Sequence, residues 1–373
     1  MSELARIIER RNLESLVIEF KDKVKALGTT VLGGGLNYLT HVVFKTVCKD
    51  FNDSDPSNYA RRIVKLLNLP TDTTAVFLTA VDVLNNKVVK LSNDPVTSLV
   101  ICTAGLENPS CIYGLRKSSQ SLSTINVLVV VDCRFSEEGL VDLFRTVTEA
   151  KALATIDLGL SCGPYRATGT VSDAIVVSHI LRDSGNEVRY AGMATNIGNT
   201  IAKLVYQAVC EASYRDLSLE REFKILTGLN LSEIVDIALK AYLKSSIPGI
   251  GLDHVKNLIE HELSSVIQDP NVWCFIQCAK CLDALGSVGR IRGLTPQEYV
   301  NDSTRIVADE ILGIALALYI NGWKALFSYY WIERLKAYRA LSKIKNLPMF
   351  MDDIISSIIG SILSKIYDKL LGN

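Results

Sequence analysis

The chain has 373 residues, of which 48% are hydrophobic and 21% are charged. This composition is ample for packed cores and excludes extensive disorder, and the length predicts two domains or three small ones. Forty basic side chains balance forty acidic ones, so no net field recruits nucleic acid or anionic membrane, and we expect small-molecule partners.

The N-terminal half mixes strand and helix signals. Short β-branched runs bounded by Gly, Asn, Asp or Pro predict strands at 15–20, 23–32, 39–47, 74–81, 86–91, 97–105, 124–132 and 175–180. Helical patterns cover Pro56–Leu67, Glu137–Leu158 and Asn196–Tyr214. Consecutive strands with helices inserted late predict an α+β domain with a mixed sheet. The first residues, Met1–Asn12, are polar and charged, so we expect no cleavable signal there.

A glycine-rich run follows the second predicted strand. Gly33, Gly34 and Gly35 precede Leu36 and Asn37. Glycine permits positive φ angles and close backbone approach to a ligand. Gly34, Gly35 and Asn37 are therefore candidate substrate contacts, although a plain hairpin turn explains the same residues.

A second polar group spans a helix and the loop before the last N-terminal strand. Thr148, Glu149 and Lys151 place a hydroxyl, an acid and a base within one helical turn. Positions three apart share a helix face, so Thr148 and Lys151 can cooperate while Glu149 points elsewhere. The loop ATGTVSDA adds hydroxyls, flexible amides and one acid, from Thr168, Gly169, Thr170, Ser172 and Asp173. Such a set can supply a nucleophile or base and an oxyanion site, but loops of this kind often only turn the chain.

Two histidines lie in predicted strands. His41 occurs in LTHVVF and His179 in IVVSHI. Histidine titrates near neutrality and can act as a general base. A single His on an apolar strand is more often a hydrogen-bonded core residue, which is the interpretation we favour.

The nine cysteines show no disulfide framework, and most lie in apolar runs. We therefore expect a reduced, cytoplasmic chain. Cys274, Cys278 and Cys281 match the C-x3-C-x2-C spacing of iron–sulfur enzymes. The same spacing marks one face of a helix, and because the flanking residues continue that helix, core packing is the favoured interpretation.

From Leu219 the pattern is helical throughout and predicts an all-α bundle. The domains expected are residues 1–212, a charged linker at 213–225, and residues 226–373. The apolar run Ile311–Ile332 has the length to span a bilayer. Asn321, Gly322 and Lys324 lie at its middle, so a break joining two buried helices is favoured over stable membrane insertion.

Two acid pairs lie in apolar helical segments near the C-terminus. Asp309-Glu310 occurs in IVADEILG and Asp352-Asp353 in FMDDIISSIIG. Buried like charges resist ionisation unless a cation neutralises them. Helix packing that joins the pairs would create a Mg²⁺ site suited to phosphate chemistry. The alternative is that each pair straddles a helix boundary with one acid in water.

Several N-terminal segments, in order, resemble the adenosylcobinamide amidohydrolases of archaeal cobamide salvage. They are VICTAGLEN, STINVLVVVD, TVTEAKALATIDLGL, ATGTVSDAIVV and YAGMATNIGNTIAKLVYQAVCEA. The resemblance implies hydrolysis of the aminopropanol amide to adenosylcobyric acid, without a cofactor. It suggests Asp173 or Glu149 as base, Thr170 or Thr168 as oxyanion donor or nucleophile, and Asn126 and Lys151 as positioning groups. The residues after TAGLEN depart from the family pattern, as does Ser172, where Thr is commoner.

The C-terminal half resembles the phosphatidylglycerophosphatase A superfamily, in its soluble branch acting on α-ribazole phosphate. The matching segments include SVIQDPNVWCFIQCAKCLDAL and LPMFMDDIISSIIGSILSKIYDKLL. The resemblance implies Mg²⁺ bound by Asp309, Glu310, Asp352 and Asp353, with Asp302 near, and Asp269 and Asp283 as further candidates. It implies phosphate contacts from Arg290, Arg292, Arg305 and Lys336, although plain surface solvation explains the arginines equally well. Glu333 and Ala337 replace the Asp and Pro of the usual motif.

Together the two resemblances imply a bifunctional hydrolase acting on adenosylcobinamide and α-ribazole phosphate. A lipid phosphatase and a non-catalytic corrinoid-binding protein are the alternatives. The sequence leaves a homo-oligomer open.

Overall fold

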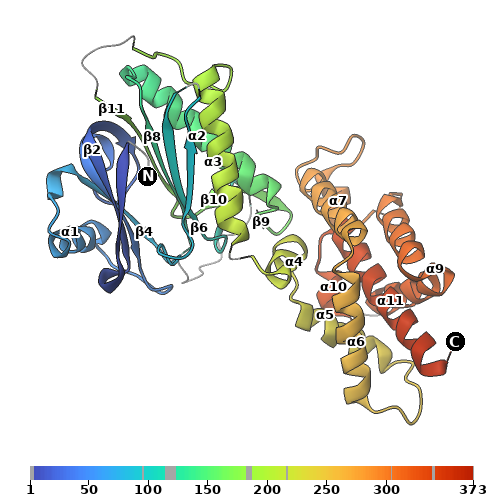
Figure 1. Cartoon of the computed structure of the whole chain (residues 1–373). Helices are drawn as coiled ribbons and strands as arrows, with labels where there is room; N and C mark the ends of the chain where they lie inside the picture. Colours follow the sequence, from blue (N-terminus) through green and yellow to red (C-terminus); the bar gives the residue numbers. More distant parts are fainter. Residues whose placement is uncertain are drawn as a thin grey trace. The chain divides into compact units, whose positions relative to one another are not determined.

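The computed structural model describes residues 4–94, 96–113, 123–181, 187–215, 217–303, 305–337 and 341–372. The chain divides into two compact units (Figure 1). The first comprises Met1–Cys162 with Ala167–Leu217, and the second Ser218–Asn373 with Gly163–Arg166. Within the predicted linker 213–225, α3 ends at Tyr214 and a further helix, α4, begins at Leu219.

A mixed eight-stranded sheet forms the first unit. Its order is β4-β3-β2-β11-β8-β6-β5, with β1 paired to β2. The strands are β1 (Ala5–Arg10), β2 (Ser15–Gly28), β3 (Gly35–Thr46), β4 (Thr74–Thr79), β5 (Val88–Ser92), β6 (Ser98–Ala104), β8 (Ile125–Val131) and β11 (Ala174–Ile180). Only β3/β4 and β8/β11 pair in parallel among these strands. A small sheet adds β7 (Pro109–Cys111), β10 (Tyr165–Thr170) and β9 (Ser161–Cys162).

The large sheet is curled, so side chains from one of its faces pack against one another. One core cluster takes its members from strands and loops alone, including Leu16, Phe44, Phe77, Ile101 and Leu128. Side chains from opposite ends of the strand order meet there, so the sheet is curled around them. Helices cover the other face: α1 (Pro56–Leu66) packs on β4, while α2 (Glu137–Asp157) and α3 (Asn196–Tyr214) lie side by side against β11 and β6 (Figure 1).

The C-terminal region from α4 to α11 is helical, as predicted. It contains α4 (Leu219–Thr227), α5 (Leu231–Tyr242), α6 (Leu252–Val266), α7 (Pro270–Gly286), α8 (Pro296–Val300), α9 (Ala308–Ala337), α10 (Ser342–Lys345) and α11 (Met349–Leu371). Helix α11 is central, because every residue from Met349 to Ser364 is buried. Helices α9, α7 and α6 make the most extensive contacts with it, and α5 and α10 also pack against it.

Helix α9 consists of two helical halves joined by a break. Asn321 and Gly322 have non-helical backbone angles, and Gly322 has a φ of 62°. The halves fold back on each other, since Gly313 approaches Tyr329 and Ala317 packs with Ala325. The predicted Asn-Gly break is confirmed. The prediction that both helices are buried is wrong, because only 28% of the most apolar window is buried.

Two predictions about cysteines are also wrong. Cys111 on β7 and Cys162 on β9 form a disulfide, so the chain is not wholly reduced. Cys274, Cys278 and Cys281 do lie on one helix, α7, but all three are exposed. The core stripe of α7 is instead Val272, Ile276, Ala279 and Asp283.

Candidate functional sites

A largely buried carboxylate, Asp173, lies at the turn between β10 and β11. Its Oδ1 accepts hydrogen bonds from the Ile125 amide at 2.9 Å and the Thr170 hydroxyl at 2.5 Å. Its Oδ2 accepts one from the Thr170 amide at 3.1 Å and another from Lys151 Nζ. Both oxygens are therefore held in place, by two donors from Thr170 at the end of β10 and by two from other elements, the Ile125 amide and Lys151 Nζ.

Lys151 reaches Asp173 from the inner face of α2. The two side chains are 9% and 10% exposed. A buried ion pair is tolerated only when hydrogen bonds satisfy both partners. Gly169 makes room for it, because a Cβ there would overlap the Asp173 carboxylate and the Lys151 ammonium. Threonine, aspartate and lysine thus form one connected group, which has the geometry of a nucleophile, its base and a cationic donor.

Polar side chains gather around this group at the start of β8. Asn126 is buried, and its side chain makes two long contacts of 3.4 Å, to Thr124 Oγ1 and the Leu78 carbonyl. Opposite it on β6 lies Thr103. The buried hydroxyls of Thr103 and Ser123 have no hydrogen-bond partner within the described residues. A buried hydroxyl without a protein partner can take its hydrogen bond from a bound water or ligand.

The buried Cys102 thiol lies close enough to Asp173 to sense its charge. Burial raises the pKa of this thiol, and the Asp173 carboxylate raises it further. Because the thiolate is the nucleophilic form, Cys102 is an inert packing residue.

Three predicted residues lie away from this group. Glu149 forms an ion pair with Arg145 at 2.8 Å on the outer side of α2. Thr148 is exposed, and its hydroxyl donates to the Phe144 carbonyl one turn earlier. Thr168 is exposed on β10. The face that Lys151 shares is buried and runs through Val147, Ala150 and Ala154, so Thr148 is one position off it.

Gly33 and Gly34 lie in the connection from β2 to β3, and Gly35 and Asn37 lie in the first residues of β3. Gly33 has a φ of 71°, and a Cβ there would meet the backbone of Ala75 at 2.7 Å. The Asn37 side-chain amide donates to the Gly34 carbonyl at 2.7 Å. This connection borders the start of β11, where the Thr29 amide donates to the Ile175 carbonyl. Gly34, Gly35 and Asn37 therefore lie at the same end of the sheet as Asp173, in the connection and at the start of β3.

Neither histidine belongs to that end of the sheet. His179 lies six residues along β11 from Asp173, about 20 Å at the strand rise, and its Nδ1 contacts the Ile180 carbonyl. His41 contacts Thr40 Oγ1 at 2.9 Å. Burial lowers the pKa of both rings, as for structural histidines.

Helix packing in the second unit brings the two acid pairs together. Asp309 and Glu310 begin the first half of α9, and Asp352 and Asp353 lie in the first turns of α11. Oxygens of Asp309, Glu310 and Asp353 all lie within 4.8 Å of one another. Asp309, Asp352 and Asp353 are buried and Glu310 is half-buried. The alternative of acids straddling helix boundaries into water is therefore not what the fold produces.

Lys336, from the second half of α9, enters the same cluster. Its Nζ lies 3.1 Å from Asp352 Oδ2, 3.1 Å from Asp353 Oδ1 and 2.7 Å from Glu333 Oε2. Burial opposes the charged ammonium, but these carboxylates outweigh it and raise the pKa of Lys336. One ammonium cannot neutralise three carboxylates, so the cluster stays short of positive charge.

This shortage of positive charge is reflected in the pKa values of the acids in the cluster. Burial raises the pKa of Asp352 to about 9, with Asp353 and Glu333 adding to it against Lys336. Burial, and then Glu310, raise the pKa of Asp309, and burial likewise raises that of Asp353. In the absence of a further cation these groups retain protons near neutral pH.

The donor atoms fit a hard divalent cation. Glu310 Oε2 and Glu333 Oε1 are buried without a hydrogen-bond partner in the part of the chain that the structure describes. Carboxylate oxygens left bare in an acidic cluster are the ligands that Mg²⁺ prefers. The nearby Tyr329 hydroxyl is fully buried and also lacks a partner among the described residues. Its apolar neighbours predict only packing, so no local pattern marks this hydroxyl as part of a site.

The other predicted residues of this half lie outside the cluster. Asp302 is exposed with a φ of 51°, and Asp269 caps α7 and bonds Tyr319. Asp283 is buried but accepts the amides of Phe350 and Met351, which caps α11, and burial raises its pKa to about 6. Arg290 and Arg292 are exposed on the segment between α7 and α8. Arg305 is engaged with Glu298 at 2.7 Å.

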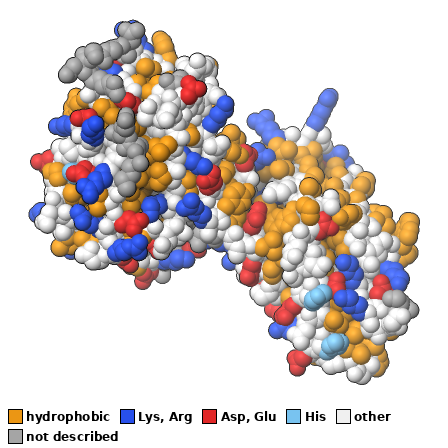
Figure 2. Space-filling model, viewed as in Figure 1, with side chains coloured by type: hydrophobic (Ala, Val, Ile, Leu, Met, Phe, Trp, Pro, Cys, Tyr) orange, Lys and Arg blue, Asp and Glu red, His pale blue; other side chains and the backbone are white. Residues whose placement is uncertain are grey.

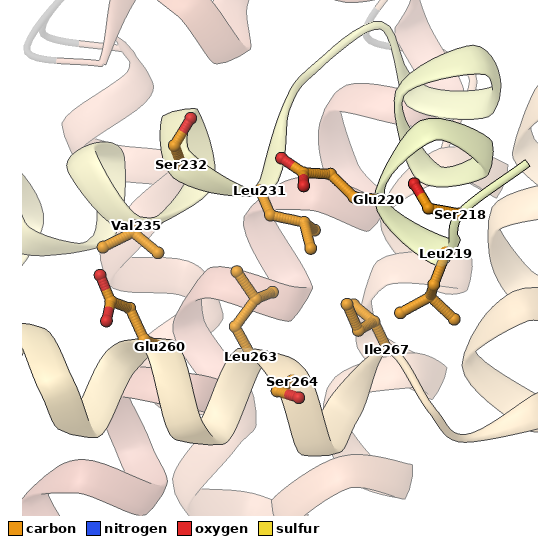
Figure 3. A pocket seen from close by; sticks show the side chains of 10 residues that line it. All are labelled: Ser218, Leu219, Glu220, Leu231, Ser232, Val235, Glu260, Leu263, Ser264 and Ile267. Carbon is orange, nitrogen blue, oxygen red and sulfur yellow. The ribbon is translucent and has the colours of Figure 1, made fainter.

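A separate cavity of about 470 Å³ opens between α4, α5 and α6. Figure 3 shows Leu231, Leu263 and Ile267 directed into it, with Glu220 and Glu260 at its rim. It is lined by no member of the acid cluster, and its chemistry is that of an apolar groove rather than a catalytic centre.

Comparison with known proteins identifies a family and several relatives. The profile of the adenosylcobinamide amidohydrolase family matches residues 1–221. An adenosylcobinamide amidohydrolase from Methanosarcina mazei is 30% identical over 188 residues, which cover 48% of this chain and 86% of the relative. Uncharacterized protein MJ1330 from Methanocaldococcus jannaschii is 29% identical over 116 residues, covering 31% of this chain and 88% of that protein.

Among solved structures, the low temperature requirement C protein from Listeria monocytogenes is 21% identical, with a TM-score of 0.35. The match covers 42% of this chain and 98% of that protein.

Proposed function

The chain belongs to the adenosylcobinamide amidohydrolase family, and we propose that Thr170, Asp173 and Lys151 carry out the hydrolysis in its N-terminal unit. The substrate amide is the one that joins the aminopropanol arm to the corrin ring. The supporting observation is the 2.5 Å hydrogen bond from the Thr170 hydroxyl to Asp173 Oδ1. A hydroxyl that donates to a fixed carboxylate is placed as a nucleophile beside its base.

The remaining roles follow from the same contacts. Thr170 Oγ1 bonds to the amide carbon as its proton passes to Asp173. Lys151 has three N–H donors, one of which serves Asp173, and another stabilises the carbonyl oxygen as it becomes an anion. Asp173 returns the proton to the amide nitrogen, the C–N bond breaks, and the aminopropanol arm leaves as an amine. Water then hydrolyses the Thr170 ester, which releases adenosylcobyric acid.

Substitution of Thr170 tests this assignment. Thr170→Val should reduce amide cleavage by at least about 10³-fold, because the nucleophile is removed, whereas Thr170→Ser should keep most of it. Thr168→Val is the matched control, since Thr168 is exposed on the same strand, and it should retain activity. The measurement is release of amine from adenosylcobinamide by chromatography. Full activity of Thr170→Val would exclude Thr170 as nucleophile and leave Asp173 acting on water.

For the second unit we propose a metal-dependent phosphomonoesterase that acts on α-ribazole phosphate. The supporting observation is the bare, buried carboxylate oxygens beside Asp309 and Asp353. Asp309, Glu310 and Asp353 would hold Mg²⁺, which when bound supplies charge stabilisation for phosphoryl transfer. Lys336 orients Asp352 and Asp353 through its two 3.1 Å contacts, and Glu333, which replaces the usual Asp, fixes Lys336.

Metal titration tests this half independently of turnover. Calorimetry with MgCl₂ and MnCl₂ should detect a site in the full chain that Asp353→Asn weakens by at least about 10-fold. Asp302→Asn is the matched control, because Asp302 is exposed. Phosphate release from α-ribazole phosphate should require the metal. Metal binding without release of phosphate would retain the site and exclude the substrate.

A further inference from the structure

The hydroxyl of Tyr329 is buried beside the acid cluster without a hydrogen bond. The side chain is fully buried, and its Oη has no hydrogen-bond partner within the described residues. Leaving a buried polar group unpaired costs free energy, and such groups are rare in folded proteins. A bound water or ion, or a role in the site's chemistry, is the usual reason that one persists.

Both halves of α9 place this hydroxyl one helical turn from acids of the cluster. In the first half, Gly313 lies four residues after Asp309, and a Cβ on Gly313 would be 2.8 Å from Tyr329 Oη. In the second half, Glu333 lies four residues after Tyr329. Residues four apart share a helix face, so the hydroxyl lies between the two faces that carry these acids.

The electrostatics agree with that position. Burial raises the pKa of Tyr329, and the carboxylates of Asp353, Glu333 and Glu310 raise it further. The hydroxyl therefore keeps its proton at neutral pH and can both donate and accept a hydrogen bond. Within the described residues, none of these carboxylates accepts its proton.

The unpaired hydroxyl is matched by unpaired carboxylate oxygens. Glu310 Oε2 and Glu333 Oε1 are buried without a partner in the described part of the chain. On the face of the molecule that Figure 2 shows, acidic and basic side chains lie interspersed at the surface, where solvent satisfies them. The buried atoms of the cluster have no such access. A cation that carries its own water satisfies both kinds of atom, because it binds the carboxylates and its water bonds the hydroxyl.

We propose that Tyr329 belongs to the cation site of the second unit, where its hydroxyl hydrogen-bonds a water molecule that the cation retains. This inference rests on the metal-dependent function proposed above. Mg²⁺ gives up its water reluctantly and keeps several water ligands in proteins. A cation polarises the water that it binds, so such a water donates strongly and needs an acceptor, which Tyr329 Oη supplies. Tyr329 is thus a positioning residue that contributes to cation affinity through the water.

Calorimetric titration of the full chain with MgCl₂ tests the proposal. Tyr329→Phe should weaken Mg²⁺ binding by at least about 10-fold, as loss of a hydrogen bond to a metal ligand does. The substitution removes only the hydroxyl and keeps the packed ring. Tyr330→Phe is the matched control, because it removes the same atom from the next residue of the helix, which is 47% exposed. It should bind Mg²⁺ as the wild type does.

Two further measurements distinguish a bond to the site from ordinary packing. In EDTA, Tyr329→Phe should keep or raise the urea midpoint followed by circular dichroism, because an unpaired buried hydroxyl is removed. Addition of MgCl₂ should perturb the near-ultraviolet tyrosine absorbance of the wild type and of Tyr330→Phe, and the perturbation should be absent from Tyr329→Phe. Weaker metal binding together with a lower midpoint in EDTA would assign Tyr329 to packing and overturn the proposal.

The titrations also separate this inference from the function on which it rests. If Asp353→Asn weakens Mg²⁺ binding and Tyr329→Phe binds as tightly as the wild type, the role of Tyr329 is overturned and the metal site stands. If the wild type binds neither MgCl₂ nor MnCl₂, the metal site and the inference fall together.

Discussion

At the scale of single residues, the two sites differ in how their carboxylates are satisfied. Asp173 receives four hydrogen bonds, one of them from a buried ammonium. The acid cluster leaves Glu310 Oε2 and Glu333 Oε1 without partners among the described residues. A carboxylate whose oxygens are fully hydrogen-bonded is held in one orientation. A cluster of carboxylates whose oxygens lack donors can bind a cation.

Gly169→Ala should disable amide hydrolysis without unfolding the chain. The new methyl group would overlap both Asp173 and Lys151, so the pair must separate. A displacement of about 1 Å in catalytic groups can cost about 100-fold in rate, and overpacking costs about 1–3 kcal/mol of stability. Steady-state kinetics and thermal unfolding measure the two effects. Gly251→Ala is the control, because nothing lies within 4 Å of a Cβ there, and equal activities of the two variants would contradict the prediction.

The stability of the metal-free second unit should fall as pH rises from about 5 to 9. Burial raises the pKa of Asp352 to about 9, and those of Asp309 and Asp353 also rise. The folded state thus binds more protons than the unfolded state above about pH 4. The stability is fully present below that pH and is lost as pH rises through the folded pKa values. Each such carboxyl contributes about 1.4 kcal/mol per pH unit in that window.

Urea unfolding in EDTA, followed by circular dichroism at several pH values, measures this slope. Added MgCl₂ should stabilise the unit more at pH 9 than at pH 6, because protons compete with the metal at the lower pH. Stability that is flat or increases with pH in EDTA would contradict the raised pKa values.

At the scale of elements, periodicity predicted most helices and strands, but not always their buried face. The predicted 196–214 helix matches α3, and 137–158 extends one residue past α2. On α7, the cysteines and the row Val272, Ile276 and Ala279 are parallel stripes of apolar residues. Spacing alone cannot choose between them, because the choice depends on contacts with α4, α9 and α11. The disulfide between Cys111 and Cys162 is likewise a contact across 51 residues that no local pattern encodes.

The candidate sites show the same limit. Helical spacing placed Thr148 with Lys151, yet the buried face of α2 excludes Thr148. By contrast, the acid pairs could be predicted as site residues from the sequence, because adjacent charges in an apolar helical segment are unfavourable for packing. No local pattern predicts a role for Tyr329, because that role depends on the hairpin formed by the two halves of α9, which brings Tyr329 to Gly313 and Gly360.

Gly360→Ala should loosen the contact of α9 with α11. A Cβ at Gly360 would lie 2.6 Å from the Tyr329 amide nitrogen, and backbone atoms cannot move aside as a flexible side chain can. We expect a loss of about 1–3 kcal/mol and weaker metal binding, since the helices that carry the acids move apart. Chemical unfolding and calorimetry measure both. Ser356→Ala on the same buried helix is the control, and equal effects of the two substitutions would show that the close approach at Gly360 is unimportant.

At the scale of the whole molecule, two unlike architectures carry the two sites. The group around Asp173 depends on a curled sheet and α2, while the acid cluster depends on α9 and α11. Within the part of the chain that the structure describes, each site draws its polar contacts from one compact unit. If both proposals hold, one chain supplies adenosylcobyric acid and α-ribazole to the same assembly, which gives their fusion a chemical reason.

Separate sites predict separable losses in the intact chain. EDTA and Asp352→Ala should abolish phosphate release, because they remove the metal or one of the carboxylates that Lys336 aligns, and should leave amide cleavage unchanged. Asp173→Ala should reduce amide cleavage by at least about 10³-fold and leave phosphate release and metal affinity unchanged. Assays of amide cleavage and of phosphate release on each of the two variants give the four measurements needed for the comparison. A loss of both activities from either substitution, in a chain with unaltered circular dichroism, would show that the sites are energetically coupled and that the two units do not act independently.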